Sequence, residues 1–180
     1  MPMLKNVLGL DLGSNSLKAV EFRQALRGLE PVQMRIHSRA SSDVDLGEQI
    51  QHFLQQYDFS AEYVSCAISG SLLSSRIYEF PFRDRKRLNQ AVPFQVEGNI
   101  PFDIDDVMTE WQIIGGDRNH SIVSTTVAQR THVSALLEDL NGGGAQPRVI
   151  ESAGLVLANL TSVFELESTS LLGLDPTSVL

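Results

Sequence analysis

The spacing of apolar residues in the first third of the chain predicts three strands, a helix and a fourth strand. Residues 4–22 read as an apolar strand, a tight Gly/Ser/Asn turn and a second apolar strand, which is typical of a β-hairpin. Residues 29–37 alternate apolar and polar positions, and residues 63–69 form a short apolar run. Between these two segments, residues 46–57 place apolar side chains at helical spacing. This order predicts a mixed sheet with one crossover helix.

A second set of elements follows in a different order. The pattern predicts a strand at 72–80, a helix at 85–99, strands at 107–114 and 121–128, and a helix at 131–140. Asp84 is the predicted N-cap of the first of these helices, and Pro93 is expected to kink that helix or to end it early. The order strand-helix-strand-strand-helix predicts a small α+β unit inserted into the first sheet.

The last part of the chain is predicted to return to the first sheet. Residues 148–151 read as a strand, and residues 152–164 read as a helix with apolar positions at helical spacing. We therefore expect two units, one made of residues 1–70 with 146–180 and the other of residues 71–145. The predicted fold class is α/β to α+β, with a mixed-sheet core and a small inserted α+β unit.

Composition and charge exclude several classes of protein. The chain has 180 residues, of which 42% are hydrophobic and 20% charged, as in ordinary globular proteins. Its net charge of -8 argues against a nucleic-acid partner. No apolar run approaches the ~20 residues that span a bilayer, and the first residues lack the apolar region of a signal peptide. The single cysteine, Cys66, lies in an apolar segment and is expected to be a buried residue of a reducing compartment.

The turn of the first hairpin carries groups that suit phosphate. Gly13 lets the backbone approach a ligand, and the hydroxyls of Ser14 and Ser16 can donate hydrogen bonds. Lys18 adds a positive charge, while Asp11 can hold water on a divalent cation. An ordinary surface hairpin explains the same residues, because Gly, Ser and Asn are common in turns. The candidate nucleotide-binding residues are Asp11, Gly13, Ser14, Asn15, Ser16 and Lys18.

Resemblance to known families favours the phosphate interpretation. Residues 11–18, DLGSNSLK, resemble the first phosphate motif of the actin, Hsp70 and sugar-kinase superfamily. Residues 80–107, with Glu97 before the run IPFD and then DDV, closely resemble the pilus-assembly protein PilM and the cytoplasmic domain of the type II secretion protein GspL. The resemblance covers essentially the whole chain. It implies an actin-like (ribonuclease H-like) ATPase half-fold.

The resemblance also implies a function. PilM and GspL are actin-like scaffolds at the cytoplasmic side of the bacterial inner membrane, in type IV pilus and type II secretion machines. Such a scaffold docks the N-terminal cytoplasmic tails of membrane partners, and the assembly ATPase is a further candidate partner. In the full-length protein the hairpin residues would bind ATP with Mg²⁺, and Asp11 would hold the Mg²⁺ through water. The residues of this chain do not separate PilM from GspL.

The resemblance to actin-like proteins is incomplete in one respect. These proteins bind nucleotide between two domains, and the second phosphate motif and the adenosine site belong to the second domain. Neither is found in this sequence. We therefore expect the chain to be the first half of the fold, and we expect it to hold no nucleotide tightly by itself.

Two further groups of polar residues have both a functional and a structural interpretation. Glu151 matches the position at which actin-like enzymes orient the attacking water, and an acidic residue in the first turn of a helix explains it equally well. The basic run Arg83, Arg85, Lys86 and Arg87 is either a solvated helix start or a docking patch for a partner or for anionic lipids.

Residues 100–107 are read as a connector in which Phe102 fills a core, with a three-Asp metal site as the alternative. Trp111 is expected to lie in a core. Two other functions stay open at this point. One is a phosphotransferase of the sugar-kinase kind, which needs a carboxylate base that the sequence does not reveal. The other is a cell-division protein of the FtsA kind.

Overall fold

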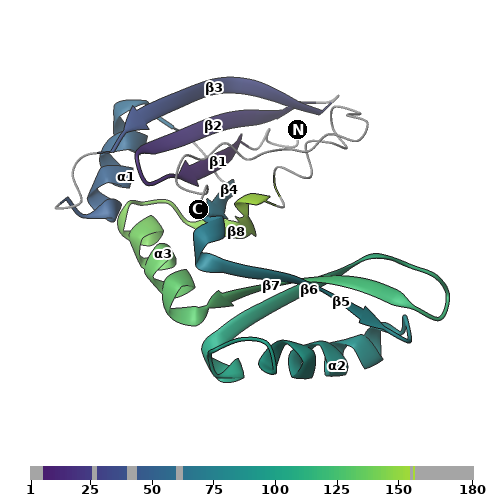
Figure 1. Cartoon of the computed structure of the whole chain (residues 1–180). Coiled ribbons are helices and arrows are strands. Elements are labelled where there is room, and N and C mark those ends of the chain that lie inside the picture. Colours follow the sequence, from purple (N-terminus) through teal and green to yellow (C-terminus); the bar gives the residue numbers. More distant parts are fainter. Residues whose placement is uncertain (1–5, 26–27, 40–43, 60–62, 155, 157–180) are drawn as a thin grey trace. The chain divides into compact units, whose positions relative to one another are not determined.

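The computed structural model of the protein describes residues 6–25, 28–39, 44–59, 63–154 and 156 (Figure 1). Its contacts divide the chain into two compact units. The core unit comprises Met1–Gly70 and Ala135–Leu180, and the inserted unit comprises Ser71–Ser134. Each unit has its own sheet and its own hydrophobic core.

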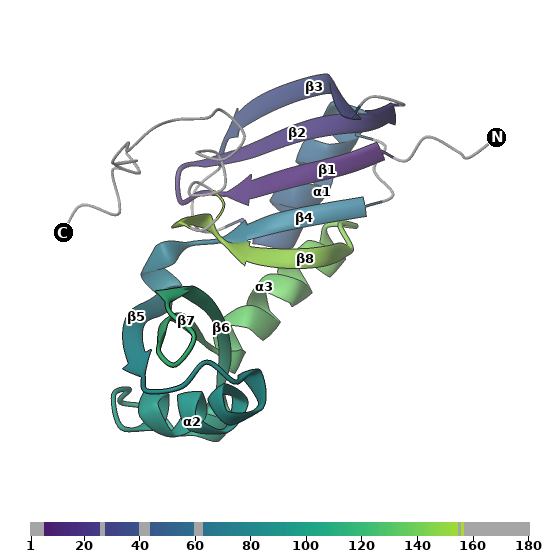
Figure 2. The same ribbon diagram turned by 90° about the vertical axis from the view of Figure 1, so that its right-hand side faces the viewer.

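The core unit is built on a five-stranded mixed sheet (Figure 2). Its strands are β1 (Asn6–Leu12), β2 (Ser16–Ala25), β3 (Gly28–Ser38), β4 (Tyr63–Ile68) and β8 (Pro147–Ser152), in the order β3-β2-β1-β4-β8. The three N-terminal strands pair antiparallel, whereas β4 is parallel to both β1 and β8. The predicted mixed sheet, its hairpin and the returning last strand are therefore confirmed.

One face of this sheet forms the first hydrophobic core. Helix α1 (Leu46–Gln56) is capped by Asp45, whose carboxylate accepts a hydrogen bond from the Glu48 backbone N–H at 3.0 Å. The helix turns Ile50 and Phe53 toward the sheet, where each is 1% exposed. The strand residues on this face are Leu8, Leu10, Leu17, Ala19, Val64 and Cys66. Alternate strand residues point to opposite faces, so their neighbours face away from α1.

Cys66 lies inside this core, as the sequence predicts. Burial raises the pKa of its thiol to about 12, and the nearby negative charge of Asp11 acts in the same direction. The thiol therefore stays protonated at neutral pH and behaves as a small apolar side chain.

The inserted unit has a three-stranded antiparallel sheet covered by one helix. Its elements are the 3-10 turn η1 (Gly70–Leu72), β5 (Leu73–Phe80), α2 (Arg85–Glu97), the 3-10 turn η2 (Ile104–Asp106), β6 (Val107–Gly116) and β7 (Ser121–Gln129). The strand order is β5-β7-β6. Leu88, Val92 and Val96 of α2 are fully buried and share a core with Val107 and Val123.

Helix α2 continues through Pro93 to Glu97, close to the predicted end at residue 99, so only the alternative of an early end at Pro93 is wrong. A proline inside a helix costs about 3 kcal/mol because it removes a hydrogen bond and crowds the preceding turn. Leu88, Val92 and Val96 lie on both sides of the proline and are fully buried, and each contributes roughly 1.5–3 kcal/mol. Burial of the apolar face of the helix therefore outweighs the local penalty. Asp84 caps the helix as predicted, accepting from the Arg87 N–H at 2.9 Å.

The boundary between the units differs from the predicted division at residues 145 and 146. Helix α3 (Arg130–Gly142) begins in the inserted unit and ends in the core unit. Leu140 and Ala145 are buried in the first core, and Leu136 packs against it, so residues 135–145 belong to the core unit. Strand β8 ends at Ser152, and residues 153, 154 and 156 are helical, so the predicted helix begins one residue later than expected. Most of the helix predicted at 152–164 lies outside the described residues.

Candidate functional site

The first hairpin turn is a tight connection between β1 and β2. Leu12 pairs with Leu17 and Asp11 pairs with Lys18, so Gly13, Ser14 and Asn15 make the turn. A Cβ at Gly13 would lie 3.0 Å from the carbonyl oxygen of Ser16, which is tighter than an ordinary contact. Ser14 and Asn15 are exposed. The turn thus presents backbone and hydroxyl groups to solvent at the end of β1.

Asp11 and Lys18 form an ion pair between β1 and β2, next to the hairpin turn. The Lys18 Nζ lies 2.8 Å from the Asp11 Oδ2, and the two side chains are 47% and 49% exposed. An exposed pair of this kind contributes at most about 1 kcal/mol to stability. Both groups can therefore exchange this contact for a ligand at little cost.

Glu151 lies in the same row of the sheet as this ion pair. Asp11 pairs with Ala67 across β1 and β4, and Ala67 pairs with Glu151 across β4 and β8. Adjacent strands lie about 4.8 Å apart, so the Asp11 and Glu151 backbones are roughly 10 Å apart. Leu10 and Cys66, one position earlier, are buried on the α1 side, so this row faces the other way.

This row lies at the carboxyl ends of the parallel strands β1, β4 and β8, where ligands bind in many open α/β sheets. The structure therefore brings together Asp11, Lys18 and Glu151 on one face, with the turn residues beside them. Glu151 is exposed and lies within strand β8. The row places one cation and two carboxylates on the same face of the sheet.

Sequence reasoning missed Arg39, which holds the turn from the end of β3. Its Nη1 donates to the carbonyl oxygen of Gly13 at 3.2 Å, and its backbone N–H donates to the carbonyl oxygen of Asn15 at 3.0 Å. Its Nε is buried and has no partner in the described part of the chain. No sequence signal marked Arg39, because it reaches the turn through the pairing of β3 with β2, in which Ser38 lies opposite Ser16.

Arg39 also influences one acidic group of the core unit, Asp139. Burial raises the pKa of Asp139, and the charges of Asp45 and Glu138 raise it further. The guanidinium of Arg39 opposes that rise. Arg39 therefore contacts the hairpin turn and also acts on the carboxyl group of Asp139 in α3.

The remaining candidates lie in the inserted unit. Arg83, Arg85, Lys86 and Arg87 are exposed around the start of α2. Asp103 caps η2, accepting from the Asp105 N–H at 3.0 Å. In the described ranges, no group of three or more His, Cys, Asp or Glu side chains could hold a metal ion. Trp111 packs against the second core, partly buried, as expected.

A pocket of about 190 Å³ opens within the inserted unit, between its sheet and the segment after α2. Its walls include Leu72, Arg76, Ile100, Phe102, Gln129 and His132. The Nδ1 of His132 is buried and has no hydrogen-bond partner among the described residues. A shallower hollow of about 300 Å³ in the core unit is lined by α1 residues, Phe59 and Gly143.

Phe102 was expected to fill a core, and this expectation is wrong. Its side chain is 43% exposed and forms part of the pocket wall. Its neighbours Ile100 and Ile104 pack against the second core. These two residues occupy the space that the sequence pattern assigned to Phe102.

Comparison with solved structures shows that the chain has a PilM/GspL-like, actin-like fold. The structure of the PilM-PilN type IV pilus biogenesis complex aligns with a TM-score of 0.77 and 22% identity, over 87% of this chain and 50% of that one. The cytoplasmic domain of EpsL, an inner membrane component of the type II secretion system of Vibrio cholerae, aligns with a TM-score of 0.58 and 18% identity, over 82% and 57%.

The chain spans about half the length of these two structures. At such identities the likeness establishes the fold, and it confirms the half-fold that the sequence predicts. No family model matches the chain, and no curated protein does. None of the helices in the described part of the chain is long and apolar enough to cross a bilayer.

Proposed function

We propose that this chain is part of a scaffold protein at the inner-membrane platform of a type IV pilus or type II secretion system. The observation that carries the proposal is the likeness over 87% of the chain to the structure of a PilM-PilN complex, with a TM-score of 0.77. The scaffold binds the cytoplasmic N-terminal tail of a membrane partner. It lies at the cytoplasmic face of the bacterial inner membrane.

The pocket of the inserted unit is the proposed docking site for the tail. Its volume of about 190 Å³ is below the ~300–1,000 Å³ of sites for drug-sized ligands, so it suits one or two side chains of a peptide. Leu72, Ile100 and Phe102 offer apolar contact. Arg76 is exposed and offers hydrogen-bond donors to the adjacent peptide backbone.

The hairpin row of the core unit is the proposed phosphate side of an ATP–Mg²⁺ site in the whole protein. Lys18 would neutralise phosphate charge, the turn amides would donate to phosphate oxygens, and Asp11 would hold the hydrated Mg²⁺. The second half of the fold would supply the adenosine site. Nucleotide then acts as a conformational ligand that favours one arrangement of the scaffold.

Phosphoryl transfer is a second candidate function, and the position of Glu151 favours it. Glu151 lies on the second strand over from Asp11, and its carboxylate could orient a water or an acceptor hydroxyl at the phosphate chain. The proposed scaffold needs no such step. Robust transfer of phosphate to a small molecule would replace the scaffold proposal with this one.

Phe102→Asp is expected to weaken tail binding at least tenfold, because it places a charge in the apolar wall of the pocket. The measurement is fluorescence anisotropy with labelled peptides from the N-terminal cytoplasmic tails of inner-membrane pilus and secretion proteins. Phe94→Asp is the matched control, because Phe94 is 76% exposed in the same unit and does not line the pocket.

The control should bind the peptide as the unchanged chain does, and both variants should keep its melting temperature within a few degrees, since both sites are exposed. Equal binding by Phe102→Asp and the unchanged chain would rule out the pocket as the docking site. Absence of binding for every tail peptide would count against the scaffold function itself.

A further inference from the structure

Five basic side chains gather at one end of the inserted unit. We call this group the basic tip: Arg83, Arg85, Lys86, Arg87 and Arg118. All five are exposed, four around the start of α2 and one in the turn between β6 and β7. The Arg83 Nη1 donates to the carbonyl oxygens of Gly115 at 3.4 Å and Asp117 at 3.3 Å, which joins the two segments.

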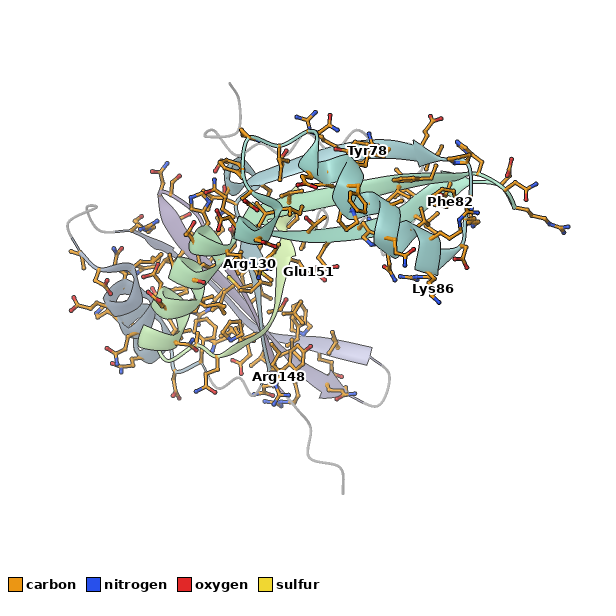
Figure 3. All side chains as sticks on the ribbon, turned by 90° about the horizontal axis from the view of Figure 1, so that it is seen from below. Tyr78, Phe82, Lys86, Arg130, Arg148 and Glu151 are labelled. Carbon is orange, nitrogen blue, oxygen red and sulfur yellow. The ribbon has the colours of Figure 1, made fainter. Side chains whose placement is uncertain are left out.

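Aromatic rings support two of these cations without neutralising them. The Arg87 guanidinium lies 4.2 Å from the centre of the Phe82 ring, and that of Arg85 lies 5.4 Å from the Trp111 ring. Figure 3 shows Lys86 at the N-terminal end of α2, with its side chain directed away from the helix. No ion pair within the described residues involves any of the five.

The two carboxylates beside the tip accept hydrogen bonds from backbone N–H groups and form no ion pair with its side chains in the described part of the chain. The Asp84 carboxylate accepts from the Arg87 backbone N–H at 2.9 Å. The Asp117 carboxylate accepts from the backbone N–H groups of Asn119 and His120 at 2.7 and 3.0 Å. Basic residues at a helix N-terminus are also unfavourable, because the helix dipole is positive there. The contacts of Arg83, Arg85 and Arg87 stabilise the fold, but no contact of this kind among the described residues explains Lys86 and Arg118.

We propose that the basic tip docks on the surface of a membrane that contains anionic phospholipids. Clusters of four to eight Lys and Arg side chains are typical of such contacts. All five side chains are exposed and none lines either of the two pockets described above, so they are accessible to an extended anionic surface. The inference goes beyond the proposed function, since it requires neither a partner tail nor a nucleotide.

The negative charge of the whole chain does not prevent this contact. The net charge is -8, but salt screens charges beyond about 10 Å at ~0.1 M ionic strength. The membrane therefore interacts mainly with the groups that approach its surface. Each basic residue at the surface contributes about a fivefold gain in partitioning.

The test is co-sedimentation of the 180-residue chain with phosphatidylcholine vesicles that either contain or lack phosphatidylglycerol. The chain should sediment only with the vesicles that contain phosphatidylglycerol, and added salt should release it. The double variant Lys86→Gln with Arg118→Gln should lose about 30-fold in partitioning, because two cations are removed. Neither residue makes an ion pair or hydrogen bond that holds the described structure, so the variant should fold.

The matched control is Arg23→Gln with Arg148→Gln, which changes the net charge equally but alters exposed residues of the core unit. It should partition within about twofold of the unchanged chain, since its two side chains lie outside the tip. Equal losses in both double variants would overturn the proposal and indicate a response to net charge alone. Absence of sedimentation, with binding of soluble polyglutamate that depends on Lys86 and Arg118, would instead assign the tip to an acidic protein partner.

Discussion

Gly143→Ala is expected to destabilise the core unit by about 1–3 kcal/mol, because the new methyl group has no room. A Cβ at this position would lie 2.6 Å from the Ile50 Cγ2, 2.7 Å from its Cβ and 3.0 Å from the carbonyl oxygen of Gly47. Ile50 is 1% exposed and packs against the sheet, so it cannot move aside easily. Urea denaturation at fixed temperature measures the change in the free energy of unfolding.

Gly142→Ala is the matched control for this prediction. Gly142 is the last residue of α3, and a Cβ there would meet nothing within 4 Å. Alanine is the better helix former, so this change should be neutral or stabilise the chain by up to about 1 kcal/mol. If the two alanine variants had equal stability, the close packing of residue 143 against α1 would be wrong.

Lys18→Met should lower the affinity of the whole protein for ATP–Mg²⁺ by about 10- to 150-fold. This corresponds to the roughly 1.5–3 kcal/mol of a hydrogen bond to a charged group. The fold should survive, because the exposed ion pair with Asp11 stabilises it little. The measurement is isothermal titration calorimetry on the form of the protein that includes the second half of the fold.

Arg23→Met is the control for Lys18→Met, since Arg23 lies exposed on the same strand and loses the same charge. It should bind nucleotide as the unchanged protein does. Glu151→Gln should also keep its affinity and should abolish any hydrolysis of the nucleotide. An unchanged affinity of Lys18→Met for ATP–Mg²⁺ would contradict the proposed role of the hairpin in binding phosphate.

The sheet of the core unit could be predicted because its sequence pattern is local. Leu8 and Leu10 of β1, and Leu17 and Ala19 of β2, alternate with more exposed residues, and all four are buried on the α1 side. The Gly, Ser and Asn residues between the two strands then predicted a hairpin turn. Helix α1 followed from the spacing of Ile50 and Phe53 on one face.

The errors arose where distant packing decides the outcome. Pro93 is tolerated because buried residues on both sides of it hold α2 against its sheet. The unit boundary moved into α3 because Leu140 contacts the first core, which no local pattern reveals. Sequence periodicity reports which face of an element is apolar, but it does not report which core that face joins.

The site was predictable in part for the same reason. Asp11 and Lys18 lie seven positions apart in one hairpin, so their contact follows from the turn. Arg39 reaches the turn only through the register of β3, and its role needed the structure. The pocket combines residues from the start of β5, the segment after α2 and the end of β7, which are far apart in the sequence.

The central claim, that the pocket holds the tail of an inner-membrane partner, is tested most directly by photo-crosslinking in cells. A photoreactive phenylalanine analogue at Phe102 should form an adduct that mass spectrometry identifies as the N-terminal tail of a pilus or secretion membrane protein. The same analogue at Ile77, which is 64% exposed in the same unit and does not line the pocket, should form none. Equal labelling at the two positions, or an adduct at Phe102 with no such tail, would contradict the account.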